Sequence, residues 1–201
     1  MGMKNFGIAI DLQKDFVSGS LGTKEAEAII PNVVEYIKAN RAHYIFTRDT
    51  HGEGYLDTRE GKMLPVKHCI KDTEGWEIDS RVMDAVQSSD WTYSIVDKKT
   101  FSTTEVEKTI RNLIEYMQQQ TYEHTFETDG HDLNITIFGL VTDICVVSNA
   151  LMLRSAFPEA TITVIGDCCA GTTPERHNAA MDVMSSCHIY INPNHKMVTH
   201  G

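Results

Sequence analysis

Short apolar segments alternate with helix-forming segments along nearly the whole chain, and this alternation limits the possible folds more than any other feature. The strand-like segments are almost continuously apolar and rich in β-branched residues, and they cover residues 6–10, 44–47, 93–96, 135–138, 161–165 and 189–191. Such runs are typical of strands that are buried on both faces. Strands that alternate with helices form βαβ units, in which the strands are parallel and helices cover both faces of the sheet. The sequence therefore predicts one α/β domain over residues 1–201 with a six-stranded parallel sheet.

Helix signals lie between these strands. After Thr104, apolar side chains recur with the 3.6-residue spacing of an amphipathic helix. We expect Pro31 in the first turn of a second helix, because proline lacks the N–H that later turns require. Thr173 followed by Pro174 predicts an N-cap and the first position of a third helix.

Two long segments depart from the alternation. Residues 49–81 are rich in glycine, charge and histidine, and they are too long for an ordinary connection, which favours a functional loop. Residues 118–133 are polar, and we interpret them as a surface insertion without a catalytic role.

Charge and composition exclude several functions. The formal net charge is -10 and no basic cluster is present, so nucleic acids and anionic membrane surfaces are not expected partners. No run approaches the roughly 20 apolar residues of a membrane span, and the N-terminus lacks the pattern of a signal peptide. We therefore expect a cytoplasmic protein. Five cysteines are an odd number in a chain with no secretory marker, so a disulfide framework is not predicted. No pair has C-x-x-C spacing, so neither a thioredoxin-like redox motif nor a zinc knuckle is predicted.

Reactive side chains follow four consecutive predicted strands. Asp11 follows the first strand, Asp49 and His51 the second, Lys98 the third and Cys145 the fourth. Ligands of open parallel sheets bind beyond the carboxyl ends of the strands, where these residues should meet. An aspartate after a strand is often only a helix cap, but the joint placement of these residues favours a catalytic site.

Cys145 is the candidate nucleophile. We expect it to open a helix, where free N–H groups and the helix dipole lower a thiol pKa and can bind an oxyanion. Asp11 is the candidate base, and Lys98 the cation that stabilises both charges. Lys99 competes for the role of Lys98, because neighbours on an extended segment point to opposite sides. Alternatively, Cys145 is a small buried apolar residue, as most free cysteines are.

A second group of residues is suited to a metal. D-x-H puts two ligands on one side of an extended segment, and the following loop returns with a glutamate and a histidine: Asp49, His51, Glu60 and His68. Histidine and carboxylate ligands together suit Zn²⁺, Fe²⁺ or Mn²⁺. Three other residues of the same loop could replace one of these ligands: Glu53, Tyr55 and Asp57.

These motifs resemble the isochorismatase-like cysteine hydrolase superfamily, and within it the nicotinamidase/pyrazinamidase branch, from about residue 6 to residue 191. Asp11 and the aromatic Phe16 five residues later match the first motif, and KKTFS matches the catalytic lysine motif with Lys98 in register. GLVTDICV resembles the nucleophile turn, with Cys145 as the nucleophile. GDCCAGTTPERHNAAM, which contains Asp167 and His177, is similar to the family's terminal segment.

The resemblance implies a Rossmann-like sheet of order 3-2-1-4-5-6 and a homo-oligomer. It also implies a cis peptide bond between Val141 and Thr142. The oxyanion is expected to bind to backbone N–H groups of the turn that contains Val141, Thr142, Ile144 and Cys145.

The metal loop favours the nicotinamidase branch, since Pro65-Val66-Lys67-His68 matches the later histidine motif, although Leu64 replaces a tryptophan often seen there. The implied reaction is hydrolysis of nicotinamide to nicotinate and ammonia, a step of NAD salvage, through a thioester on Cys145. The implied cofactor is a divalent metal, Zn²⁺ or else Fe²⁺ or Mn²⁺, that binds the pyridine nitrogen. Phe16 is a candidate to stack on the substrate.

Three alternatives remain open from the sequence. The chain could be a related hydrolase of isochorismate or of a carbamoyl or ureido compound, which would act without this metal. It could be a non-catalytic metal-binding protein of the same fold. It could also be a redox sensor that uses the adjacent Cys168 and Cys169, although neighbouring cysteines rarely form disulfides.

Overall fold

The computed structural model describes residues 3–121 and 129–197 and contains one six-stranded sheet. The strands are β1 (Lys4–Ile10), β2 (His43–Asp49), β3 (Tyr93–Lys98), β4 (Leu133–Leu140), β5 (Thr161–Ala170) and β6 (Tyr190–Asn192). Their order in the sheet is β3-β2-β1-β4-β5-β6, and every neighbouring pair is parallel. The predicted fold class and strand order are therefore confirmed.

Central strands are buried as their apolar runs predict. In β1 the last five residues, from Phe6 to Ile10, are all buried, and β4 is buried from Ile135 to its end. Each such aliphatic side chain contributes about 1.5–3 kcal/mol when removed from water. These strands therefore form a rigid base for the residues that follow their carboxyl ends.

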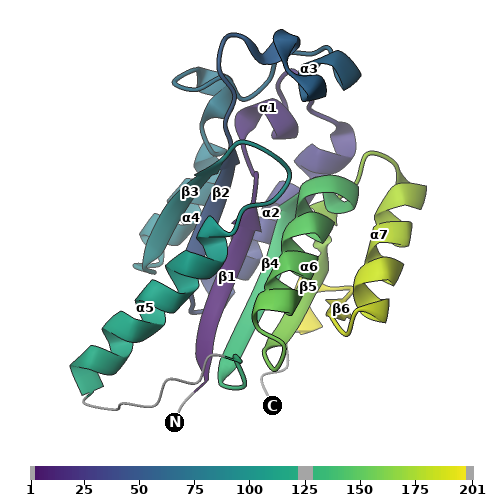
Figure 1. Cartoon of the computed structure of the whole chain (residues 1–201). Coiled ribbons are helices and arrows are strands. Elements are labelled where there is room, and N and C mark those ends of the chain that lie inside the picture. Colours follow the sequence, from purple (N-terminus) through teal and green to yellow (C-terminus); the bar gives the residue numbers. More distant parts are fainter. Residues whose placement is uncertain (1–2, 122–128, 198–201) are drawn as a thin grey trace.

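Helices cover both faces of the sheet. They are α1 (Lys14–Val17), α2 (Lys24–Ala39), α3 (Arg59–Met63), α4 (Ser80–Ser88), α5 (Glu105–Thr121), α6 (Val147–Ala156) and α7 (Pro174–Ser186). Figure 1 shows α5 and α6 on one face and α2 with α4 on the other. The short helices α1 and α3 lie together at the carboxyl ends of the strands (Figure 1), where the candidate site was predicted.

Two of the three helix signals hold as predicted. The helix after Thr104 begins at Glu105, and Thr173 caps α7 by accepting a hydrogen bond from the N–H of Arg176. The prediction for Pro31 was wrong, because α2 begins at Lys24 and Pro31 lies in its interior. Thr23 determines that earlier start, since its side chain accepts a hydrogen bond from the N–H of Ala26.

The two long segments differ from their predictions in detail. Residues 49–81 include the 3₁₀ turns Tyr55–Asp57 and Glu74–Trp76 as well as α3, and α4 already begins at Ser80. The segment predicted as a polar insertion begins inside α5, which continues to Thr121, and it ends at the first residue of β4. Its central residues, 122–128, lie outside the described part of the chain.

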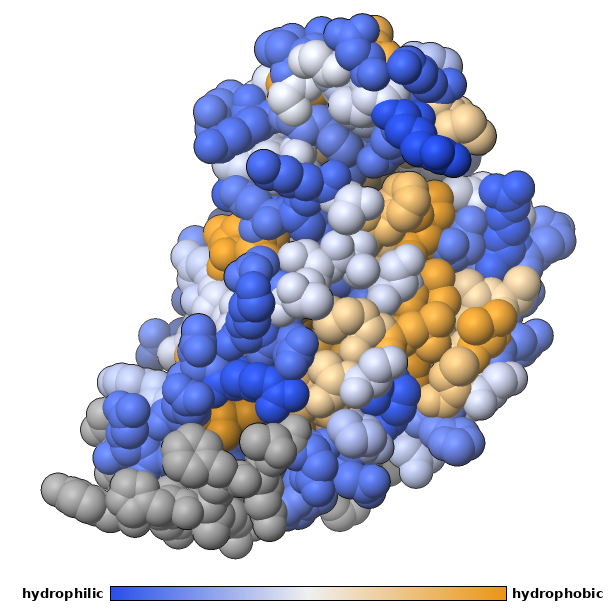
Figure 2. Space-filling view, viewed as in Figure 1, coloured by the Kyte–Doolittle hydropathy of each residue, from blue (hydrophilic) through white to orange (hydrophobic). Residues whose placement is uncertain are grey.

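Apolar surface on the face seen in Figure 2 gathers over α6 and toward α7, whereas the end that carries α3 is hydrophilic. A shallow groove of about 410 Å³ lies in the apolar region beside α6 and α7, with Ile144, Val147 and Val183 among its lining residues. In the described part of the chain, no helix is both long enough and apolar enough to cross a membrane. The predicted homo-oligomer stays a prediction.

Candidate active site and metal centre

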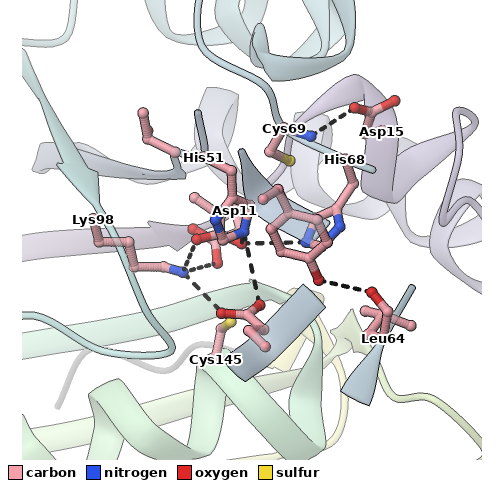
Figure 3. A network of polar contacts seen from close by, with 12 residues as sticks. Asp11, Asp15, His51, Leu64, His68, Cys69, Lys98 and Cys145 are labelled. Carbon is pink, nitrogen blue, oxygen red and sulfur yellow. Dashed lines mark hydrogen bonds and ion pairs between the residues drawn. The ribbon is translucent and has the colours of Figure 1, made fainter. Parts of the chain in front are cut away.

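Three side chains that lie at or beyond the carboxyl ends of three different strands meet at this edge of the sheet (Figure 3). The Nζ atom of Lys98 lies 2.7 Å from Asp11 Oδ2 and 3.5 Å from Cys145 Sγ. All three residues are buried, with exposed fractions of 0% for Asp11, 2% for Lys98 and 5% for Cys145. Lys99 is exposed, so the strand alternation of β3 turns Lys98 alone toward the site.

The backbone and a neighbouring strand hold Asp11 in place. Asp11 follows β1 with a φ of 46°, a left-handed conformation that costs free energy for a residue other than glycine. Thr47 of β2 fixes it in two ways: its Oγ1 accepts a hydrogen bond from the Asp11 N–H at 3.1 Å and donates one to Asp11 Oδ1 at 2.6 Å. The second carboxylate oxygen is left for Lys98.

Burial governs the protonation of these groups. Burial lowers the pKa of Lys98, but the charges of Asp11, Cys145 and Asp49 outweigh it, so the net pKa is raised and the ammonium form persists. Burial also raises the pKa of Asp11, and Lys98 opposes that rise. The pKa of the Cys145 thiol is raised by burial and by the charge of Asp11. The expectation of a lowered thiol pKa was therefore wrong, because desolvation and the charge of Asp11 outweigh the opposing charge of Lys98.

The turn that carries Cys145 is a π-helical segment, Thr142–Val146, directly before α6. Cys145 therefore lies just ahead of the α-helix that it was predicted to open. The cis peptide bond joins Leu140 to Val141, so its predicted position between Val141 and Thr142 was wrong by one residue. The reason is where the regular elements end: β4 runs to Leu140 and the π-helical turn begins at Thr142, so the cis bond joins the strand to Val141, the one residue between the two elements.

Side chains from later segments brace this turn. Thr142 Oγ1 lies 2.9 Å from His177 Nδ1 of α7, and the Asp143 carboxylate accepts hydrogen bonds from the N–H and Oγ1 of Thr172. The N–H of Ile144 donates to the carbonyl of Val141. Among the predicted oxyanion residues, Ile144 thus already uses its N–H within the turn.

The four predicted metal ligands also meet at this edge. Each offers a ligand atom, and these atoms all lie within 4.8 Å of one another: Asp49, His51, Glu60 and His68. Asp49 is central, because its Oδ2 lies 3.0 Å from His51 Nε2 and 3.6 Å from His68 Nε2. Its other oxygen, Oδ1, is buried without a hydrogen-bond partner. Two imidazoles and two carboxylates grouped in this way fit a divalent transition metal.

Other groups orient the ligands, as is usual around metal sites. His68 Nδ1 lies 2.9 Å from the carbonyl of Val66, which leaves Nε2 to face the cluster. The ring of Tyr55 packs against both histidines, with centroids 4.5 Å from His51 and 4.9 Å from His68. The Tyr55 hydroxyl donates to the carbonyl of Leu64, away from the cluster.

The alternative ligands in this loop are not part of the cluster. Glu53 forms an exposed ion pair with Lys67 at 3.0 Å. The Tyr55 hydroxyl donates to the carbonyl of Leu64, and Asp57 is not among the four residues of the cluster. The geometry therefore favours the four residues first proposed from the sequence.

Lys98 connects the two centres. Besides its contacts with Asp11 and Cys145, its Nζ lies 3.4 Å from Asp49 Oδ1. One buried ammonium thus neutralises the candidate base and a candidate metal ligand together, so the two groups form a single electrostatic unit.

Gln13 is a structural residue of this site that the sequence analysis missed. Its Nε2 donates to the carbonyls of Asp49 and Trp76, at 2.9 and 2.8 Å, and its Oε1 accepts from the N–H of Asp49 at 2.7 Å. The available signal was its position two residues after Asp11, directly beyond the first predicted strand.

A pocket of about 340 Å³ adjoins the nucleophile turn. It is mostly apolar, and Phe16, Val141 and Ile144 are among its lining residues. Phe16 is buried on α1, and its ring centroid lies 5.4 Å from that of His68. The predicted stacking residue is thus located between the pocket and the metal ligands.

Other residues of the family-like terminal segment lie away from this centre. Asp167 contacts His195 rather than Asp11, Lys98 or Cys145, and Asp167 Oδ2 lies 2.7 Å from His195 Nδ1. Cys168 and Cys169 are part of β5, and both are buried free thiols.

Comparison with known proteins shows the family to which the chain belongs. The family model for the isochorismatase domain matches residues 7–192. The chain belongs to the isochorismatase family. Among curated proteins, the nicotinamidase of Saccharomyces cerevisiae is 24% identical over 174 residues, which are 72% of this chain and 78% of the yeast protein. The chain is thus an isochorismatase-family hydrolase with a nicotinamidase among its relatives.

Solved structures of this family share the fold. The nicotinamidase/pyrazinamidase of Bacillus subtilis superimposes with a TM-score of 0.71 at 22% identity, covering 94% of this chain and 100% of that protein. The pyrazinamidase of Pyrococcus horikoshii in complex with zinc gives a TM-score of 0.67 at 26% identity, covering 94% and 98%.

Proposed function

We propose that this isochorismatase-family hydrolase is a nicotinamidase, which converts nicotinamide to nicotinate and ammonia as a cytoplasmic step of NAD salvage. One observation carries the proposal: Lys98 contacts Asp11, Cys145 and the metal-ligand candidate Asp49 at once. This contact unites a thiol nucleophile, a base and a cluster suited to a divalent metal at one end of the sheet.

In the proposed first step, Asp11 accepts the proton of the Cys145 thiol as sulfur attacks the amide carbonyl. The raised pKa of the thiol means that it stays protonated until a base removes the proton during attack. The raised pKa of Asp11 suits it to hold that proton and then transfer it to the departing ammonia.

Lys98 and the turn stabilise charge in this scheme. The Lys98 ammonium lies within 3.5 Å of the sulfur and offsets the negative charge that passes between Cys145 and Asp11. The N–H of Cys145 is the proposed donor to the oxyanion, since the N–H of Ile144 is used by Val141. Water, deprotonated by Asp11, then hydrolyses the thioester and releases nicotinate.

Asp49, His51, Glu60 and His68 would hold a divalent metal, Zn²⁺ in our proposal. When bound, such a metal supplies a Lewis acid for the lone pair of the substrate's ring nitrogen. Phe16, packed beside His68, would form an apolar wall for the ring. The ring would thereby be oriented with its amide group toward Cys145.

The test is ammonia release from nicotinamide by the purified protein and by two cysteine variants. We expect release by the native chain, full loss in Cys145→Ala and no change in Cys187→Ala, which alters an exposed cysteine. Full activity of Cys145→Ala would refute the mechanism. If the folded, zinc-loaded native protein releases no ammonia, nicotinamide is not its substrate, and other amides and ureido compounds become the candidates.

Metal removal tests the cofactor separately. Dialysis against a chelator should abolish nicotinamide hydrolysis, and added Zn²⁺ should restore it. Benzamide, which lacks the ring nitrogen, should be a poor substrate of the zinc-loaded protein. Equal hydrolysis of benzamide and nicotinamide would contradict the proposed role of the metal.

A further inference from the structure

A second group of metal-binding side chains lies apart from the catalytic cluster. Asp167, Cys168 and His195 each offer a ligand atom, and these atoms all lie within 4.8 Å of one another. None of these three residues belongs to the catalytic group Asp11, Lys98 and Cys145 or to the first metal cluster. We propose that these residues form a second, structural site for a thiophilic divalent metal such as Zn²⁺.

An irregularity in β5 explains how adjacent residues share one site. In a regular strand, neighbouring side chains point to opposite faces. Val164 pairs with Ile137 and Cys169 pairs with Gly139, so β5 advances five residues while β4 advances two. A bulge of this kind redirects side chains, and Asp167 and Cys168 lie within it.

His195 joins the site from the segment after β6. Its exposed fraction is 8%. Its Nδ1 lies 2.7 Å from Asp167 Oδ2, and its backbone N–H donates to Asp167 Oδ1 at 2.8 Å. Two of the three proposed ligand atoms, the His195 ring nitrogen and the Asp167 carboxylate oxygen, therefore already face each other.

The other ring nitrogen of His195 faces a carboxylate. Nε2 is buried without a hydrogen bond of normal geometry, and Glu35 Oε2 of α2 lies 3.2 Å from it at ion-pair distance. Metal-bound histidines usually direct their second ring nitrogen to a carboxylate, which fixes the ring and strengthens its bond to the metal. Lys196 holds the other oxygen of Glu35 at 3.4 Å, which keeps that carboxylate in position.

The set of ligand atoms determines the class of metal. One thiolate, one imidazole and one carboxylate suit Zn²⁺ and Co²⁺, whereas Mg²⁺ and Ca²⁺ prefer oxygen ligands alone. Binding would release the Cys168 thiol proton and the proton between His195 and Asp167 to solvent, because the ligands coordinate in deprotonated form. Water would complete a four-coordinate site.

The position of the site indicates a structural role. Asn32 of α2 donates to the carbonyl of Asp167 at 2.9 Å, so helix α2 already contacts the bulge of β5. A metal held by Asp167, Cys168 and His195 would fasten the C-terminal segment to the same point. A metal that binds only the folded state stabilises it, so the unfolding temperature should rise with metal concentration.

Cobalt distinguishes this site from the catalytic one. The first metal cluster, Asp49, His51, Glu60 and His68, contains no cysteine, so a near-ultraviolet thiolate-to-cobalt charge-transfer band would report on Cys168. Metal-free, reduced protein titrated with Co²⁺ should bind two equivalents and develop this band. Cys168→Ser should lose the band and one equivalent, while Cys187→Ser and Cys145→Ser should keep both.

His195→Gln serves as a second variant in case Cys168→Ser does not fold. It should also lose one equivalent and weaken the band, yet retain nicotinamide hydrolysis if that activity is present. The double variant His51→Ala/His68→Ala should lose the other equivalent and keep the band. A native protein that develops no thiolate band, or a band of native intensity in Cys168→Ser and His195→Gln, would overturn the proposal and leave the His195–Asp167 contact as a hydrogen-bonded link.

Discussion

Replacement of Gln13 by leucine tests whether this buried amide fixes the position of Asp49. Gln13 is fully buried and forms three hydrogen bonds to backbone groups, two of them to Asp49 and one to Trp76. Leucine fills a similar volume but leaves three buried polar groups without a partner. Each such group costs roughly 1–3 kcal/mol, or about 3–9 kcal/mol for three, and partial relaxation should bring the loss to about 3–5 kcal/mol.

Urea unfolding of the metal-free protein is the appropriate assay, because bound metal would add its own stabilisation. With a slope of about 1–3 kcal/mol/M, the unfolding midpoint should fall by on the order of 1–5 M. Gln87→Leu is the matched control: Gln87 is exposed on α4, so its loss should change stability by less than about 0.5 kcal/mol. A Gln13→Leu variant within about 1 kcal/mol of the native chain, at an unchanged slope, would refute the reasoning.

Two further predictions concern charge. Lys98→Met leaves the buried carboxylates of Asp11 and Asp49 without their cation. The substitution should lower the free energy of unfolding by about 3–5 kcal/mol and the rate of ammonia release by at least roughly 100-fold. Native-like stability and rate would contradict the bridging role of Lys98. Asp79→Ala should cost about 1–2 kcal/mol at pH 7, because Asp79 caps α4 and binds Arg81. Burial raises the pKa of Asp79, but the hydrogen bonds from Arg81 outweigh that effect, so the net pKa in the folded protein is lowered. The stability that Asp79 contributes is therefore present above the unfolded pKa of about 4 and is lost as the pH falls through the folded pKa. Urea titrations at pH 7 and pH 3 should show the gap between the native chain and Asp79→Ala narrowing in acid, and a constant gap would contradict the assignment.

The sequence predicted the fold and the candidate site because both depend on regular strands. Apolar runs identified the strands, and in a parallel sheet their carboxyl ends lie at one edge, which brings Asp11, Lys98 and Cys145 together. Alternation along an extended strand limits the lysine role to one of two neighbours, and the structure gives it to Lys98. The D-x-H spacing indicated the metal ligands for a similar reason.

The sequence predictions were wrong where the backbone is irregular or where a property, such as a pKa, depends on many surrounding residues. The cis bond was misplaced by one residue because the end of β4 depends on its pairing with neighbouring strands. Pro31 was assigned to a first turn because the sequence pattern did not weigh the capping side chain of Thr23. The thiol pKa of Cys145 was expected to be lowered, since desolvation by the surrounding core cannot be read from the turn alone.

The sequence by itself determined the parallel sheet, the edge that carries the chemistry and the residues that could act there. The tertiary structure alone decided that Gln13 fixes Asp49, that Lys98 joins two centres and that a bulge in β5 places Asp167 and Cys168 beside His195. The physical reason is that local periodicity tells which face of an element a side chain occupies. Distances between residues far apart in the chain follow only from how the elements pack.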